Sequence, residues 1–145
     1  MPMSHHSNQA ISDDGRYMAL TRDIRVLVDP AYLEDRSDPE AHQFVWSYTI
    51  EIRNEGSQTV QLKERYWKII DANGKIEHVR GSGVVGEQPI INPGEVFEYT
   101  SGCPLETNSG FMVGHYTMES PQSETFDIDI PAFALDLPGT RRVVN

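Results

Sequence analysis

Near the middle of the chain stands the segment Phe44-Val45-Trp46-Ser47-Tyr48-Thr49-Ile50-Glu51-Ile52-Arg53. Its even-numbered positions are all large and apolar, whereas its odd-numbered positions are mostly smaller or polar. Side chains alternate across a strand, so the first set is expected to face a core and the second mostly water. Burial contributes about 1.5–3 kcal/mol for each large apolar side chain, which fixes the register of such a strand. The segment therefore predicts a β-strand with one buried face.

The segments on either side repeat this pattern over shorter lengths. The clearest turn signals between them are Asn54-Glu55-Gly56-Ser57 and Asp71-Ala72-Asn73-Gly74, because Asn and Gly tolerate the backbone angles of tight turns. Tyr66 and Trp67 are adjacent apolar residues, so alternation fails near them and a β-bulge is expected. Six further strands are expected, at about residues 24–28, 60–70, 75–79, 95–99, 111–118 and 126–130.

This succession of short strands and turns is typical of an all-β protein. We expect an immunoglobulin or fibronectin type III-like antiparallel β-sandwich of about seven strands. The chain has one cysteine, Cys103, so it lacks the paired cysteines of true immunoglobulin domains. That difference favours the fibronectin-like variant.

The remaining segments are expected to be loops and tails around one domain. Residues 1–21 are polar and mixed, which predicts a flexible N-terminal tail. The domain is expected to span residues 22–137, followed by a C-terminal tail at 138–145. Within it, the acidic segment 29–40 and the segment 101–109 are expected to be loops, and Pro131 to end the last strand.

Composition excludes several classes of function. The net charge is −10, with 22 acidic and 12 basic residues, which opposes binding to a nucleic acid backbone. No apolar run approaches the roughly 20 residues needed to span a membrane, and no signal peptide is visible. A single cysteine fits a reducing compartment, so a cytoplasmic location is expected. The dipeptide His5-His6 is expected to be an exposed part of the tail, with no third metal ligand at a diagnostic spacing.

The motif Gly81-x-Gly83-x-x-Gly86 resembles a nucleotide-binding loop, but its surroundings differ. A dinucleotide fingerprint needs a helix after the third glycine, and here two prolines and a glycine follow within eight residues. Gly81 and Gly86 also have the spacing of the two glycines of a phosphate-binding P-loop. That loop needs Lys directly after the second of them, and Glu87 follows Gly86. We expect the glycines to permit positive φ where the chain leaves a strand. The alternative is a weak site for phosphate or pyrophosphate, built from Arg80, Gly81, Gly83 and Gly86, with His78 as a further candidate beside Arg80.

No arrangement of residues indicates catalysis. Cys103 could act as a nucleophile only with His78 or His115, and no spacing supports such a pair. Asp127 and Asp129 lie on one face of a strand and alternate with apolar residues, so they are expected to face solvent. We therefore predict no enzyme activity, no cofactor and no metal ligand set.

Several motifs together resemble the bacterial ApaG family. They cover about residues 22–136 and comprise Tyr66-Trp67-Lys68-Ile69, the segment Val79 to Pro89, Pro93-Gly94-Glu95, the segment Tyr99 to Leu105, the segment Gly110 to Met118, and Ile130-Pro131-Ala132-Phe133. The resemblance implies a fibronectin type III-like β-sandwich. It also implies relatives fused into eukaryotic F-box proteins and a polymerase-interacting protein, where the domain is a protein-interaction module. Bacterial members are linked to cobalt resistance and magnesium efflux by no agreed mechanism, and the family has no established catalytic residues.

Two functions remain open from the sequence. The first is a non-catalytic binding module that acts through protein–protein interaction with an unidentified protein partner, through loops or an edge strand. The second is a small-ligand protein whose glycine loop binds phosphate or pyrophosphate, with or without a divalent cation. Glu87, and the absence of Lys at that position, favour the first.

Overall fold

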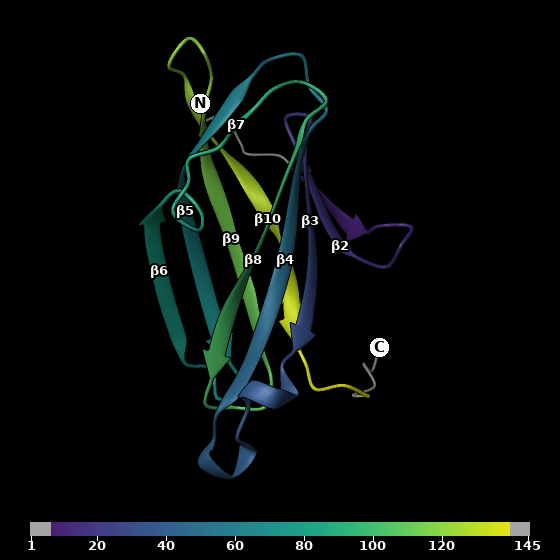
Figure 1. Cartoon of the computed structure of the whole chain (residues 1–145), viewed down its shortest axis with the longest axis vertical. Helices are drawn as coiled ribbons and strands as arrows, with labels where there is room; N and C mark the ends of the chain where they lie inside the picture. The colour runs from purple at the N-terminus through teal and green to yellow at the C-terminus, as the bar shows by residue number, and fades with distance from the viewer. Residues whose placement is uncertain (1–6, 140–145) are drawn as a thin grey trace.

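The computed structural model describes residues 7–139 as two antiparallel β-sheets with almost no helix. One sheet has the order β1-β2-β3-β4-β8, and the other has the order β10-β9-β5-β6, with β7 pairing to β5 (Figure 1). Two short 3-10 turns, η1 (Glu34–Arg36) and η2 (Pro39–Ala41), connect β3 to β4. The strands are β1 (Asn8–Ile11), β2 (Tyr17–Thr21), β3 (Ile24–Tyr32), β4 (Phe44–Asn54), β5 (Val60–Asp71), β6 (Ile76–Ser82), β7 (Ile90–Ile91), β8 (Val96–Leu105), β9 (Gly110–Glu119) and β10 (Thr125–Leu135).

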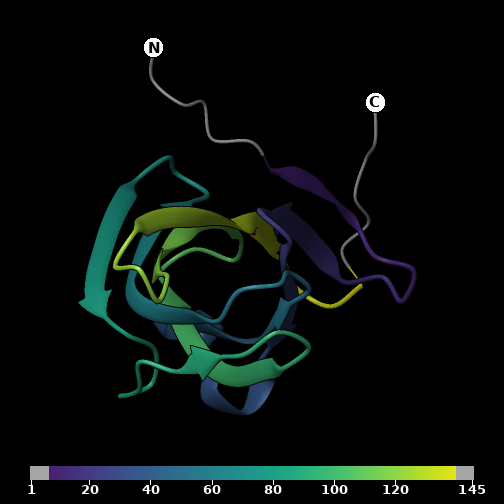
Figure 2. The ribbon, with the colours of Figure 1, turned by 90° about the horizontal axis from the view of Figure 1, so that it is seen from above.

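The two sheets face each other across one apolar core (Figure 2). The even-numbered residues of β4 are buried along its whole length, as the alternation predicts. Trp46 is 1% exposed, and its indole N–H donates to the Asp136 carbonyl at 2.8 Å. From the other sheet, Met112, Tyr116 and Met118 of β9 point into the same core. The expected all-β sandwich is confirmed, and each of the seven expected strands is present.

The expectation of a flexible N-terminal tail over residues 1–21 is wrong for its described part. Strand β2 pairs with β3 along its full length, and Ala19 and Thr21 are buried at 0% and 2% exposure. The side chain of Gln9 in β1 accepts a hydrogen bond from the Ala132 N–H of β10. These strands are short, and besides their hairpin pairing they are stabilised by contacts with β10, which is distant in sequence. Residues 1–6, with His5-His6, and residues 140–145 of the predicted C-terminal tail lie outside the described residues.

Three prolines were expected to interrupt or flank strands, and the strands continue through them. Pro30 lies in β3 beyond its pairing with β2, and Pro104 lies in the edge strand β8. Proline is tolerated at such edges because its missing N–H would face away from the neighbouring strand. Pro131 falls within a register shift between Ile130 and Phe133 of β10. The predicted loops at 29–40 and 101–109 therefore begin later, after Tyr32 and Leu105.

Strand β5 contains the expected bulge, although earlier than Tyr66. Leu62 pairs with Met118 and Glu64 pairs with Thr117, which leaves Lys63 as an extra residue. The buried positions change parity across it, from Val60 and Leu62 to Trp67. As a result Trp67 points into the core and Tyr66 points to the outside of the sheet.

Candidate functional site

The glycine motif forms the end of β6 and a tight reverse turn after it. Gly81 lies within β6, whereas Gly83 and Gly86 have φ values of +62° and +80°. The Val84 N–H donates to the Glu87 carbonyl at 2.8 Å, and the Glu87 N–H donates to the Val84 carbonyl at 2.8 Å. This pairing leaves a two-residue turn at its tip. The prediction of positive φ in this motif is confirmed.

Packing explains why glycine is needed in the motif. A Cβ atom on Gly83 would lie 2.1 Å from the Glu87 carbonyl oxygen. The Gly83 N–H donates to the Lys63 carbonyl, at the bulge of β5, at 2.9 Å. The turn thereby holds the Val84 side chain in the core, where it is 0% exposed. Three N–H groups that a phosphate nest would use, those of Gly83, Val84 and Glu87, already donate to carbonyls.

The structure separates Arg80 from the glycines with which it was grouped. Arg65, on the core-facing side of β5, lies across Gly81 and donates to the carbonyls of Ser82 and Gly83 at 3.1 and 2.8 Å. Arg80 lies on the opposite side of the sheet, with its guanidinium carbon 4.4 Å from the centroid of the Tyr66 ring. The cation nearest the glycine turn is therefore engaged by carbonyls. These contacts argue against the phosphate-binding alternative.

We name the solvent-facing side of the sheet β10-β9-β5-β6 the outer face. On this face, Arg80 belongs to a cluster of aromatic and basic side chains. Tyr66 occupies its centre, with Arg80 and His115 directly opposite on the two neighbouring strands. The Tyr66 hydroxyl is hydrogen-bonded to Nδ1 of His78 at 2.7 Å, and the two rings are stacked at 5.9 Å. The His115 ring lies 5.0 Å from the Tyr66 ring. The ring of Tyr66 is thus held in place by three neighbours.

An apolar row adjoins this cluster on the outer face. Ile70 pairs with Ile76 on one side and with Phe111 on the other, so the three side chains form a line across the sheet. Phe111 is 57% exposed and Ile76 is 49% exposed. Isolated apolar residues are common on protein surfaces, but a contiguous row beside aromatic and basic side chains is typical of a contact surface.

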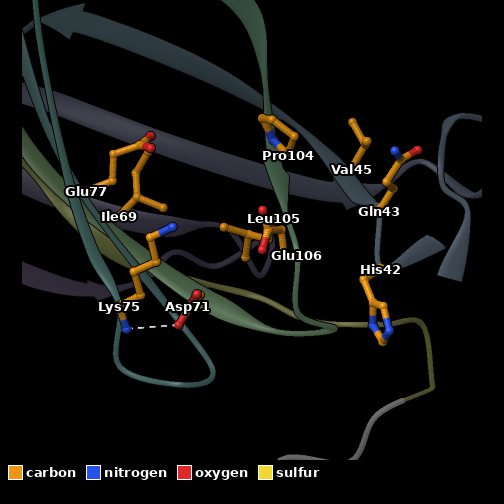
Figure 3. Close-up of a pocket in the computed structure, with 10 residues that line it drawn as sticks. All are labelled: His42, Gln43, Val45, Ile69, Asp71, Lys75, Glu77, Pro104, Leu105 and Glu106. Atoms are coloured by element: carbon orange, nitrogen blue, oxygen red, sulfur yellow. Dashed lines mark hydrogen bonds between the residues drawn. The ribbon is translucent and has the colours of Figure 1, made fainter. Parts of the chain in front are cut away.

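A hollow of about 390 Å³ lies beside β6, on the flank where the edge strands β6 and β8 end their sheets (Figure 3). Its lining combines apolar residues such as Ile69 and Leu105 with the charged Lys75, Glu77 and Glu106. The carboxylate of Asp71 is held in the hairpin turn, where it accepts the N–H groups of Asn73 and Lys75 at 2.8 and 2.9 Å. The hollow therefore offers a surface to any chain that lies along β6.

The groups considered for catalysis are poorly placed for it. Cys103 is 3% exposed, and burial raises the pKa of its thiol to about 12. A thiol of that kind is not a nucleophile near neutral pH. His78 and His115 instead flank Tyr66 on the outer face. Within residues 7–139, no three His, Cys, Asp or Glu side chains are grouped so that they could hold a metal ion.

The sequence identified Arg80 and His78 as candidates but not Tyr66 or His115, which complete the cluster. Tyr66 and His78 are placed against Arg80 by the hairpin that turns at Asn73-Gly74, and that turn is a readable signal. His115 joins them from β9, which is distant in sequence, so no local signal indicates it.

Within residues 7–139, no helix is long and apolar enough to cross a membrane.

These features define a small β-sandwich domain with a structural glycine turn and an exposed aromatic and basic sheet face. The family model described as the ApaG domain matches residues 34–120. The chain is 62% identical over 129 residues to Protein ApaG of Mesorhizobium japonicum, covering 89% of this chain and 99% of that protein. It is 57% identical over the same length, with the same coverage, to Protein ApaG of Rhizobium etli. The chain belongs to the ApaG family.

Solved structures agree with this assignment. A putative ApaA protein from Bordetella pertussis superposes with a TM-score of 0.79 and 45% sequence identity. The match covers 81% of this chain and 96% of that one. The fold is therefore shared over nearly the whole of that protein.

Proposed function

We propose that this chain is a non-catalytic binding module that acts through protein–protein interaction. The observation that carries the proposal is the outer face, where the exposed Ile76 and Phe111 adjoin the Tyr66 cluster on a sheet. Aromatic residues and arginine are enriched in protein interfaces, and exposed apolar patches mark them. Burial of the Cys103 thiol supports the non-catalytic part of the proposal.

We place this interaction in the cytoplasm, with which the single, buried Cys103 is consistent. The family's link to cobalt resistance and magnesium efflux would then act through the bound protein. On this proposal the module binds its partner and the partner handles the cation.

Affinity capture from the native host with matched variants tests the proposal. Phe111→Ser and Ile76→Ser remove apolar surface from the outer face, and Ile90→Ser removes a comparably exposed side chain, at 61%, from another strand. We expect a protein that is captured by the parent chain and by Ile90→Ser but lost with Phe111→Ser. Equal capture by all variants would exclude the outer face as the interface.

A direct assay tests the non-catalytic part. The chain should not turn over ATP, ADP, NAD or pyrophosphate, with or without magnesium. We expect dissociation constants of about 1 mM or weaker for these compounds, equivalent to about 4 kcal/mol. Turnover would contradict the non-catalytic proposal. Binding tighter than about 10 μM that is lost in Gly83→Ala would make the glycine turn a phosphate-binding site.

A further inference from the structure

Arg80 differs from most other arginines within residues 7–139 in the contacts that its guanidinium group makes. Five of the seven arginines within residues 7–139 donate to a carboxylate or a carbonyl, as Arg25 does to Glu55 at 2.7 Å and Arg65 does to Gly83 at 2.8 Å. Arg36 and Arg80 have no such partner among these residues. Of these two, only Arg80 rests on an aromatic ring.

The Tyr66 ring holds the Arg80 guanidinium in a defined orientation on an exposed surface. Its hydroxyl is fixed by His78, so the ring cannot swing away without breaking a 2.7 Å hydrogen bond. A guanidinium stacked on a ring keeps its N–H groups at its edge, where they can form paired hydrogen bonds with a carboxylate. Less side-chain entropy is lost on binding when the guanidinium group is already held in place.

Charge is distributed unevenly over the chain, and the hairpin of β5 and β6 carries the exception. The hairpin of β5 and β6, residues 60–82, holds all 3 lysines and 2 arginines, against 3 acidic residues. The rest of the chain holds 7 basic and 19 acidic residues. The carboxylates of Asp127 and Asp129 share the outer face but lie on β10, at the other end of the sheet from β6, and Asp127 lies 3.8 Å from His115. The net positive charge of the hairpin therefore favours an anionic group along β6.

The outer edge of β6 is available for strand pairing, because β6 ends the order β10-β9-β5-β6. His78 and Arg80 are two residues apart in this strand and point to the same face. An extended chain along β6 would place every second side chain beside these two residues. Its other side chains would lie over the hollow lined by Ile69 and Glu77.

We propose that the outer face binds an extended acidic peptide segment of a partner protein, which pairs with the free edge of β6. Carboxylates at alternate positions of that segment are recognised by Arg80 and His78. This inference rests on the proposed protein-binding function and names the class of partner. It assigns Arg80 to peptide recognition and not to the glycine turn.

A synthetic probe tests this inference directly. The probe is an eight-residue capped peptide of alternating Glu and Thr, and its counterpart has Gln in place of Glu. NMR titration at about 50 mM salt, where surface charges are weakly screened, gives both affinity and location. We expect the Glu peptide to bind about tenfold more tightly than the Gln peptide, the effect of one charge-assisted hydrogen-bonded pair. The β6 amides should gain protection from hydrogen exchange.

Matched variants assign the effect to Arg80. Arg80→Gln should weaken binding of the Glu peptide about tenfold, and Arg80→Lys should restore only part of it because an ammonium lacks the fork. Arg36→Gln removes the other unpaired arginine and should change nothing. Both positions are exposed, so the variants are expected to fold, which circular dichroism checks.

Each contrary outcome overturns the inference in a distinct way. If the Glu peptide does not bind at about 1 mM, or binds Arg80→Gln equally well, the acidic peptide assignment fails. Inorganic phosphate that competes at equal concentration would make the site one for phosphate groups. Self-association that Arg80→Gln abolishes would make the occupant a second copy. Host capture that depends on Phe111 but not on Arg80 would leave the proposed function standing while this inference fails.

Discussion

The hydroxyl groups of Tyr99 and Tyr116 are hydrogen-bonded to each other in the core. Tyr99 lies in β8 and Tyr116 lies in β9, so the contact joins the two sheets. Both side chains are buried, at 7% and 0% exposure. Burial raises the pKa of both phenols, which keeps them neutral and able to hydrogen-bond across a wide pH range.

Replacing one member of this pair should destabilise the protein more than its size suggests. Tyr116→Phe leaves the Tyr99 hydroxyl buried without its partner, at an expected cost of about 1–3 kcal/mol in the free energy of unfolding. Tyr99→Phe together with Tyr116→Phe should cost less than the sum of the two single changes. Urea unfolding measures all three variants. Tyr66→Phe on the outer face is the control and should change stability by less than about 0.5 kcal/mol.

Stability should fall at alkaline pH, and four buried groups contribute, because burial also raises the pKa of Tyr48. The pKa of Cys103 rises from 9.0 to about 12 in the folded state, and the pKa values of Tyr99 and Tyr116 are raised above 10.0. In the unfolded chain these groups ionise at their ordinary values, so their contribution is complete below pH 9 and lost as pH rises towards 12. Urea midpoints measured from pH 8 upwards should decline. In Cys103→Ala the decline should start at higher pH.

Two glycines in the same turn should respond differently to alanine. Gly83→Ala meets the Glu87 carbonyl oxygen at 2.1 Å and also adopts a positive φ. We expect it to cost clearly more than about 1 kcal/mol, because the neighbouring backbone must move. Gly86→Ala has no atom within 4 Å and should cost only about 1 kcal/mol, the conformational part. Equal losses in thermal unfolding would show that packing at Gly83 is unimportant.

Val85 occupies a backbone conformation that does not suit it. Its φ is +43°, although it is β-branched, and its side chain is 54% exposed at the tip of the turn. Val85→Asn should therefore stabilise the protein by roughly 1 kcal/mol, because Asn tolerates this conformation and little packing is lost. Val96→Asn is a matched control, equally exposed but within β8, and should not stabilise. Calorimetric melting temperatures of both variants test this: a rise for Val85→Asn alone is expected, and no rise would contradict the strain at Val85.

Strand β2 should behave as part of the folded core. Ala19 is fully buried and pairs with Val26 of β3. Amide exchange of residues 17–21 should therefore be slowed to an extent comparable with the paired part of β3. Ala19→Asp would bury an unpaired charge and should destabilise the protein by several kcal/mol. Exchange of these amides at the unprotected rate would contradict the pairing.

The strands that could be predicted are those whose own residues carry the pattern. The even face of β4 and the alternation of Met112 and Tyr116 in β9 depend only on neighbouring residues, and both are confirmed. Strands β1 and β2 were not predicted, because β1 is exposed and held by pairing with β2, while the burial of β2 comes from pairing with β3 and from contacts with β10. Prolines were misleading for a related reason. Whether a missing N–H matters depends on whether a neighbouring strand faces it.

The candidate site was predictable only in part. The Asn73-Gly74 turn pairs Ile70 with Ile76, and counting back along the hairpin brings Tyr66 opposite Arg80. The position of His115 depends on the pairing of β5 with β9, which is set by the whole sandwich. The hairpin register puts Arg65 and Arg80 on opposite faces, and the bulge at Lys63 decides which of the two faces the core. Such features appear only when distant strands are in register.

The extra residue at Lys63 has a consequence for length variation in this family. A deletion there would leave the strand intact as a ribbon but exchange its two surfaces downstream, bringing Tyr66 inward and turning Trp67 to water. The structural effect would appear several residues beyond the deletion, where core-facing and solvent-facing side chains exchange sides. Insertions and deletions in this short stretch should therefore be far more damaging than single substitutions of Lys63 itself, which leave the register unchanged.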